Sequence, residues 1–178
     1  MQSKDFDLFK NTFNFDNCEI INEDEILTLK EFKKIFINLS QSSTYKEEFE
    51  QRLSWYYQQV LKLSFVIDFI NKFKEKIVIW DADTIILKKI NFFNNNISNN
   101  FGTFFEFHKP YYLTTKNIFG VLPSVFISSL TQFISISLED NRVLNKRLNN
   151  FFKKNSMSTS KWISNIILKS IFDVHKIY

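Results

Sequence analysis

Residues 77–84 read IVIWDADT, a short apolar strand that leads directly into two aspartates, Asp81 and Asp83. Side chains two positions apart on a strand project to the same face, so both carboxylates aim at one point. They repel each other unless a cation lies between them or one takes a proton. Carboxylate oxygens suit Mg²⁺ or Mn²⁺, which in turn bind phosphate oxygens. The stretch therefore favours a metal–phosphate site, with two solvated acids in a turn as the alternative.

Composition narrows the class of protein. The 178 residues are enough for one domain, spanning residues 1–178, with a real core, and the 22 Phe exclude a disordered chain. Only two Gly are present, and neither G-x-G-x-x-G nor G-x-x-x-x-G-K occurs, so a glycine-rich phosphate loop is excluded. The net charge of +4 is compatible with nucleotide phosphates or a lipid headgroup surface. Signatures of base recognition are missing, so we expect no nucleic-acid partner.

Cellular location follows from what the chain lacks. The single cysteine, Cys18, argues against a disulfide framework, and we expect it to be buried as a small hydrophobic residue. The first residues have no apolar signal-peptide core, and no run of 18 apolar residues exists. We therefore expect a cytoplasmic protein, and the sequence leaves its oligomeric state open.

The rest of the chain alternates between extended and helical patterns, which predicts an α/β layer architecture. Extended segments are expected at 18–21, 77–80, 101–108 and 111–115, and helices at 22–39, 47–74, 124–138, 141–152 and 161–172. Asn22 and Glu25 form a capping-box pattern at the first helix. Residues 134–138 also alternate as a strand would, so that stretch stays open between the two structures.

The helix expected at 47–74 carries a polar stripe that continues as an apolar one. The polar stripe consists of Trp55, Gln58, Gln59 and Lys62, and the same face later carries Val66, Phe69 and Ile70. A polar stripe continuous with a buried face favours the lining of a cleft. The alternative is an ordinary solvated helix face with one exposed tryptophan.

A second pair of candidate residues lies on the strand expected at 101–108. Glu106 and His108 share one face of it, opposite a face rich in Phe, and Pro110 ends the strand. The pair is thus expected at the carboxyl end, where α/β sheets commonly bind ligands, within about 10 Å of Asp83. A carboxylate beside an imidazole offers both an acceptor and a donor to a polar ligand. A satisfied structural histidine is the alternative.

Three segments together resemble a family of bacterial glycosyltransferases of surface polysaccharide or lipopolysaccharide synthesis. In that family a W-Y-x-Q-Q-x-x-K-[LM] helix precedes W-D-[AS]-D-T and then E-x-H-[KR]-P-Y-[FY]. The matching segments here are WYYQQVLKL (55–63), WDADT (80–84) and EFHKPYY (106–112), with an acidic segment at 22–26. The resemblance covers about residues 15 to 172.

The resemblance implies a GT-A-like (Rossmann-like) mixed sheet flanked by helices, and a nucleotide sugar as donor. It implies a glycan or lipid-linked acceptor and peripheral contact with the inner membrane. The family's opening nucleotide-binding strand and a later acidic and aromatic motif have no obvious copy here. The chain is therefore expected to be truncated at both ends.

The resemblance also implies roles for individual residues. Asp81 and Asp83 would hold Mn²⁺ or Mg²⁺ and with it the donor diphosphate. Glu106 and His108 would be catalytic, contacting the sugar or acting as acid and base. The cleft for donor or acceptor would be lined by Trp55, Gln58, Gln59 and Lys62. Among these, Lys62 suits a phosphate as a point charge.

Two other functions stay open. In a phosphatase resembling the haloacid dehalogenases, Asp81 would be the nucleophile and Asp83 the general acid/base. That family expects Thr or Val where this chain has Ile85. The other possibility is a non-catalytic remnant that binds a ligand or a partner without turnover.

Overall fold

The structure is a computed structural model that describes residues 3–13, 16, 18–40, 46–80, 85–87, 89–95, 97–98, 109–119 and 133–175. Most of these residues are helical. The helices are α1 (Ser3–Thr12), α2 (Glu23–Ile26), α3 (Leu29–Ser40), α4 (Lys46–Gln51), α5 (Leu53–Phe73), α6 (Lys109–Phe119), α7 (Leu138–Phe151) and α8 (Thr159–His175). The strands are β1 (Ile77–Trp80), β2 (Phe93–Asn94), β3 (Ile97–Ser98) and β4 (Phe133–Ile136).

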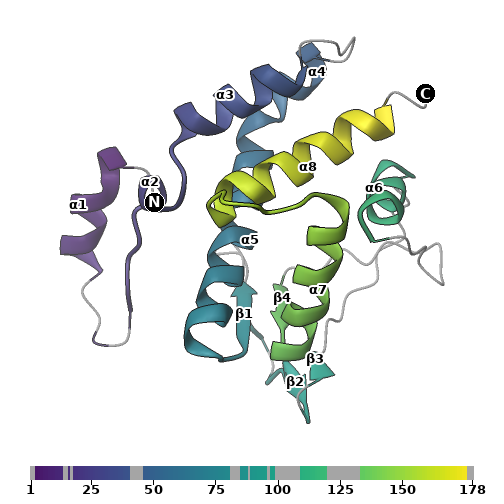
Figure 1. The fold of residues 1–178 in the computed structure, drawn as a ribbon. Helices are drawn as coiled ribbons and strands as arrows, with labels where there is room; N and C mark the ends of the chain where they lie inside the picture. Colours follow the sequence, from purple (N-terminus) through teal and green to yellow (C-terminus); the bar gives the residue numbers. More distant parts are fainter. Residues whose placement is uncertain are drawn as a thin grey trace.

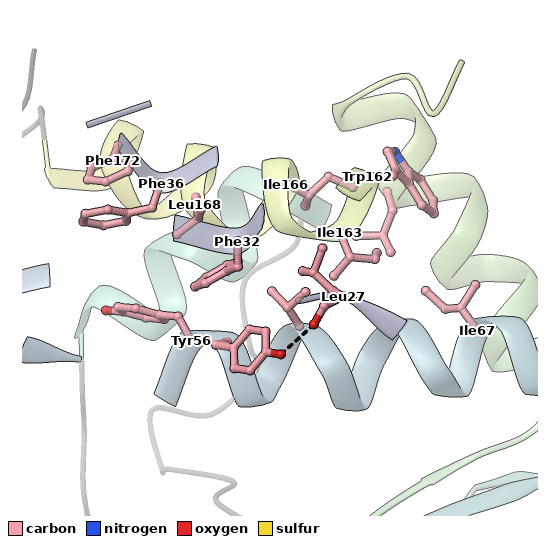
Figure 2. Packing of buried hydrophobic residues seen from close by; sticks show 13 residues of the cluster. Leu27, Phe32, Phe36, Tyr56, Ile67, Trp162, Ile163, Ile166, Leu168 and Phe172 are labelled. Atoms are coloured by element: carbon pink, nitrogen blue, oxygen red, sulfur yellow. Dashed lines mark hydrogen bonds between the residues drawn. The ribbon is translucent and has the colours of Figure 1, made fainter. Parts of the chain in front are cut away.

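The main core lies where α3 and α8 pack on one side of α5 (Figure 2). Helix α8 contributes Trp162, Ile163 and Ile166, all almost completely buried. Helix α5 contributes Tyr57 and Val60 to the same cluster. Burying a large apolar side chain contributes about 1.5–3 kcal/mol relative to leaving it exposed. This cluster is therefore the main source of cohesion among the three helices.

A two-stranded sheet packs on another side of α5. Strands β1 and β4 pair antiparallel, with Ile77 opposite Ile136. A second buried cluster joins this sheet to the C-terminal half of α5, where Val66 and Ile70 pack against Ile136. Strand β1 begins shortly after α5 ends and runs back beside it (Figure 1). Helix α5 thus separates the helical core from the sheet.

Several expected elements are confirmed because their signals are local. β1 occupies residues 77–80 as expected, and α8 covers the helix expected at 161–172. Helix α7 covers the helix expected at 141–152 but begins earlier, because Ser137 forms a capping box with Asp140. A helix at 47–74 is confirmed over most of its length, with a break at Arg52 that separates α4 from α5.

The single helix expected at 22–39 is wrong, because the chain breaks at Leu27 into α2 and α3. Leu27 is extended (φ −166°), and its carbonyl accepts a hydrogen bond from the Tyr57 hydroxyl at 2.6 Å. Asn22 does cap α2, accepting from the Asp24 N–H. Thr28 starts α3, where its hydroxyl accepts from the N–H of Glu31. This cap satisfies an N–H group in the first turn of α3, which lowers the free-energy cost of starting a second helix there.

Three further expectations are corrected. Residues 18–21 form no strand, and Cys18 is exposed rather than buried. Residues 111–115 are helical within α6, since Pro110 lies in the first turn, where a missing N–H is tolerated. Residues 133–136 form β4 rather than helix, as their alternating pattern had allowed.

The GT-A-like sheet stays a prediction. The strand expected at 101–108 lies outside the described residues, and the strands that are described pair antiparallel in two small sheets. None of the helices in the described part of the chain has both the length and the apolar character needed to cross a lipid bilayer.

We expect Tyr57→Phe to lower the free energy of unfolding by about 1–2 kcal/mol, because it leaves the buried Leu27 carbonyl without its donor. Burial raises the pKa of Tyr57 above its usual value, and the nearby Glu23 and Asp24 add to the shift, so the hydroxyl keeps its proton. Urea unfolding of the variant measures the loss. An unchanged midpoint would show that the hydrogen bond does not hold the α2–α3 break.

Candidate functional site

Strand β1 ends immediately before Asp81 in the sequence. It ends at Trp80, whose half-buried ring meets Phe92 edge-on at 6.0 Å between centroids. Asp81 and Asp83 follow directly in sequence but lie outside the described residues. The next described segments return beside β1, since the Lys76 ammonium lies 5.2 Å from the ring centroid of Phe93. Described residues on both sides of the aspartates in the sequence, Trp80 before them and Phe92 and Phe93 after them, thus lie near β1.

The polar stripe lies on the N-terminal half of α5. Trp55 is 47% exposed, and its ring packs edge-on against Tyr56 at 5.2 Å. Gln58 is exposed, whereas Gln59 and Lys62 are half-buried. The stripe therefore presents one aromatic face and several polar groups to any molecule that reaches it.

The polar stripe and the end of β1 lie on the same side of α5. Lys62 is one turn before Val66, which packs on the sheet. The reversal between α5 and β1 takes only residues 74–76, and Lys74 closes the helix in a left-handed conformation (φ 59°). The four residues of β1 rise about 10 Å, and seven residues of α5 rise about the same. Trp80 thus comes roughly level with Val66, and Lys62 lies about one turn further toward the start of α5.

Comparison of the chain with models of protein families, with curated proteins and with solved structures finds no match. Any assignment of function therefore rests on the residues themselves and on where the fold places them.

The metal site and the second residue pair stay predictions. Within the described ranges, no group of three or more His, Cys, Asp or Glu side chains lies together as a metal site would. Asp81 and Asp83 fall outside those ranges, as do Glu106 and His108. The expected spacing of about 10 Å between that pair and Asp83 is likewise outside them.

Sequence reasoning missed one polar cluster between α5 and α8. The Thr159 hydroxyl donates to Asp68 at 2.6 Å and accepts from the Lys154 ammonium at 2.8 Å. The same ammonium lies 5.4 Å from the ring centroid of Trp162. The sequence does not reveal the cluster, because Asp68 and Thr159 are 91 positions apart. Its hydroxyl is buried and has both partners, so the cluster ties two helices together rather than offering a nucleophile.

Proposed function

We propose that this chain is a nucleotide-sugar-dependent glycosyltransferase, or a shortened relative of one, that acts in the cytoplasm on a bacterial surface glycan or lipid-linked acceptor. The observation that carries the proposal is the sequence IVIWDADT, in which strand β1 leads directly in sequence to Asp81 and Asp83, and the polar stripe with Trp55 and Lys62 on α5 supports it. The three sequence motifs that resemble the glycosyltransferase family support the same function.

The carboxylate oxygens of Asp81 and Asp83 are suitable ligands for a hard divalent cation. Two carboxylates leave most positions around Mg²⁺ or Mn²⁺ for water and for phosphate oxygens. The cation, when bound, would neutralise the charge that builds on the departing nucleotide diphosphate. Asp81 and Asp83 would hold it at the end of β1. Without the cation, two carboxylates aimed at one point would repel the diphosphate.

The polar stripe supplies the remaining functions. Lys62, half-buried and one turn before Val66 on α5, would bind a phosphate as a point charge. The exposed ring of Trp55 offers an apolar face to a sugar or a base. Gln58 and Gln59 would donate to and accept from sugar hydroxyl groups. These groups bind and orient the donor, whereas Glu106 and His108 are proposed to act at the transferred sugar.

The test is a titration of the full chain with UDP- and GDP-sugars in the presence and absence of Mn²⁺. The proposal expects binding that requires the metal, together with slow hydrolysis of the donor. Turnover of phosphate esters without donor binding would favour the phosphatase instead. Metal-dependent binding without any hydrolysis or transfer would identify a non-catalytic remnant, and no binding at all would contradict the site.

We expect Lys62→Met to weaken donor binding by about tenfold, since it keeps the apolar stem of the side chain and removes one charge-assisted contact to phosphate. Lys33→Met is the matched control, because it removes the same charge from an exposed position on a different helix, α3. Isothermal titration with donor and Mn²⁺ measures both variants. Equal affinities for the two would remove Lys62 from the site.

A further inference from the structure

A basic turn with an exposed aromatic ring joins α5 to β1. Residues 71–76 read NKFKEK, and all six are exposed. We propose that this turn binds the anionic headgroup surface of a lipid bilayer through Lys72, Lys74 and Lys76 and the ring of Phe73. The turn lies at the opposite end of α5 from the polar stripe. Its test needs no donor, so the proposal stands or falls independently of the enzymatic one.

The lysines of this turn keep their charge available. Within the described residues, none of the three forms an ion pair with a carboxylate. The Lys72 ammonium lies 4.8 Å from the ring centroid of Phe73, and the Lys76 ammonium lies over Phe93. Glu75 is the one acid among the six residues, so the turn carries a net charge of +2. An anionic surface is therefore attracted to it without first breaking an ion pair.

Phe73 is fixed in place and yet half-exposed. It ends a row of rings along α5, in which Phe65 lies 5.8 Å from Phe69 and Phe69 lies 4.7 Å from Phe73. Nevertheless 51% of Phe73 is accessible to solvent. A ring held by a neighbour on one side can insert into the headgroup region with little loss of side-chain entropy.

Ordinary helix chemistry explains only part of the turn. Cations favour the C-terminal end of a helix, which accounts for Lys72 and Lys74. It does not account for Lys76, which lies beyond the helix, or for the exposed ring of Phe73. It also does not explain why Lys74 takes a left-handed backbone (φ 59°), a position that glycine fills at lower cost.

A bilayer fits this surface better than a nucleic acid. Single-stranded nucleic acid binds by stacking bases on open ring faces. Phe73 is the only ring of the turn, and Phe69 and the Lys72 ammonium already lie against it, so the turn offers no row of rings on which successive bases could stack. The turn also contains no arginine, the side chain that most often reads bases. Lysine charge together with one apolar ring is the combination that binds anionic interfaces.

Sedimentation with vesicles tests the proposal on the full chain. We expect binding to vesicles of phosphatidylcholine with phosphatidylglycerol, no binding to phosphatidylcholine alone, and release at high salt. Replacing Lys72, Lys74 and Lys76 by Gln should weaken partitioning of the protein onto the anionic vesicles. The expected loss is about fivefold per lysine, or on the order of 100-fold in total. Phe73→Ala should cause a further severalfold loss at constant charge.

Helix α3 offers matched controls. Its exposed Lys30, Lys33 and Lys34 changed to Gln remove the same charge, and Ile37→Ala removes a side chain that is 50% exposed. These variants should bind within about twofold of the parent. Equal losses for both lysine triples would show attraction to net charge alone and overturn the proposal. So would a lack of binding to any vesicle, or binding of an RNA oligonucleotide that depends on the turn while vesicles do not bind.

Discussion

Asp81→Asn and Asp83→Asn should each reduce metal-dependent donor binding at least 100-fold while leaving the fold intact. Removing one of two carboxylates takes away half of the protein's charge on a hard cation, and an amide oxygen replaces it poorly. Loss of even an outer partner of a metal ligand commonly costs 10- to 100-fold, so loss of a ligand itself should cost more. Titration of each variant with UDP-sugar and Mn²⁺ measures the effect.

Asp7→Asn provides the control for charge, because Asp7 is exposed on α1. It should bind donor as the parent does. Circular dichroism should be the same for all three variants. If both motif variants bind as tightly as the parent, the metal assignment is wrong. If binding persists but phosphate-ester hydrolysis disappears in Asp81→Asn, the phosphatase interpretation replaces the glycosyltransferase.

Elements with strong local signals could be predicted from the sequence. The apolar run before Asp81 is β1, and the helix expected at 161–172 is α8, in which Trp162, Ile163 and Ile166 recur at helical spacing and are buried. Val66, Phe69 and Ile70, which continue the polar stripe along α5, pack against the sheet, as the periodicity predicted of a buried face. In each case the pattern repeats over several neighbouring residues, so no distant contact is needed to decide it.

The errors occur where a distant contact decides the structure. The break at Leu27 depends on a hydrogen bond from Tyr57, thirty positions away. The short stretch 133–136 becomes a strand because β1 supplies its partner, and an apolar run of that length is ambiguous by itself. Proline is compatible both with the end of a strand and with the first turn of a helix, and in the structure Pro110 lies in the first turn of α6.

The candidate site could be predicted only in part. Periodicity assigned the polar stripe to one helix face, but the sequence alone did not determine how far each side chain is exposed. It also did not show that β1 turns back along α5 after only residues 74–76, which brings the end of β1 to within about one turn of the stripe. The polar cluster of Asp68, Lys154 and Thr159 escaped prediction for the same reason as the break at Leu27, since its members come from separate elements.

Trp162 and Trp55 should respond to truncation in opposite ways. Trp162 is 1% exposed and its indole N–H donates to the Phe152 carbonyl at 2.7 Å. Trp162→Ala should therefore lower the free energy of unfolding by about 3–5 kcal/mol, through the cavity and the lost hydrogen bond. Small domains are stable by only about 5–15 kcal/mol, so this variant should be close to unfolding at moderate temperature. Urea unfolding followed by circular dichroism measures it.

Trp55→Ala is the matched variant, because the same side chain is removed from a position that is 47% exposed. Its free energy of unfolding should stay within about 0.5 kcal/mol of the parent. Its affinity for the nucleotide sugar should fall roughly tenfold, since an aromatic face that stacks on a ligand contributes at this level. A large loss of stability would mean that Trp55 belongs to the core. Unchanged stability with unchanged affinity would mean that the polar stripe is an ordinary solvated face, and the site would then be reduced to the segment that follows β1.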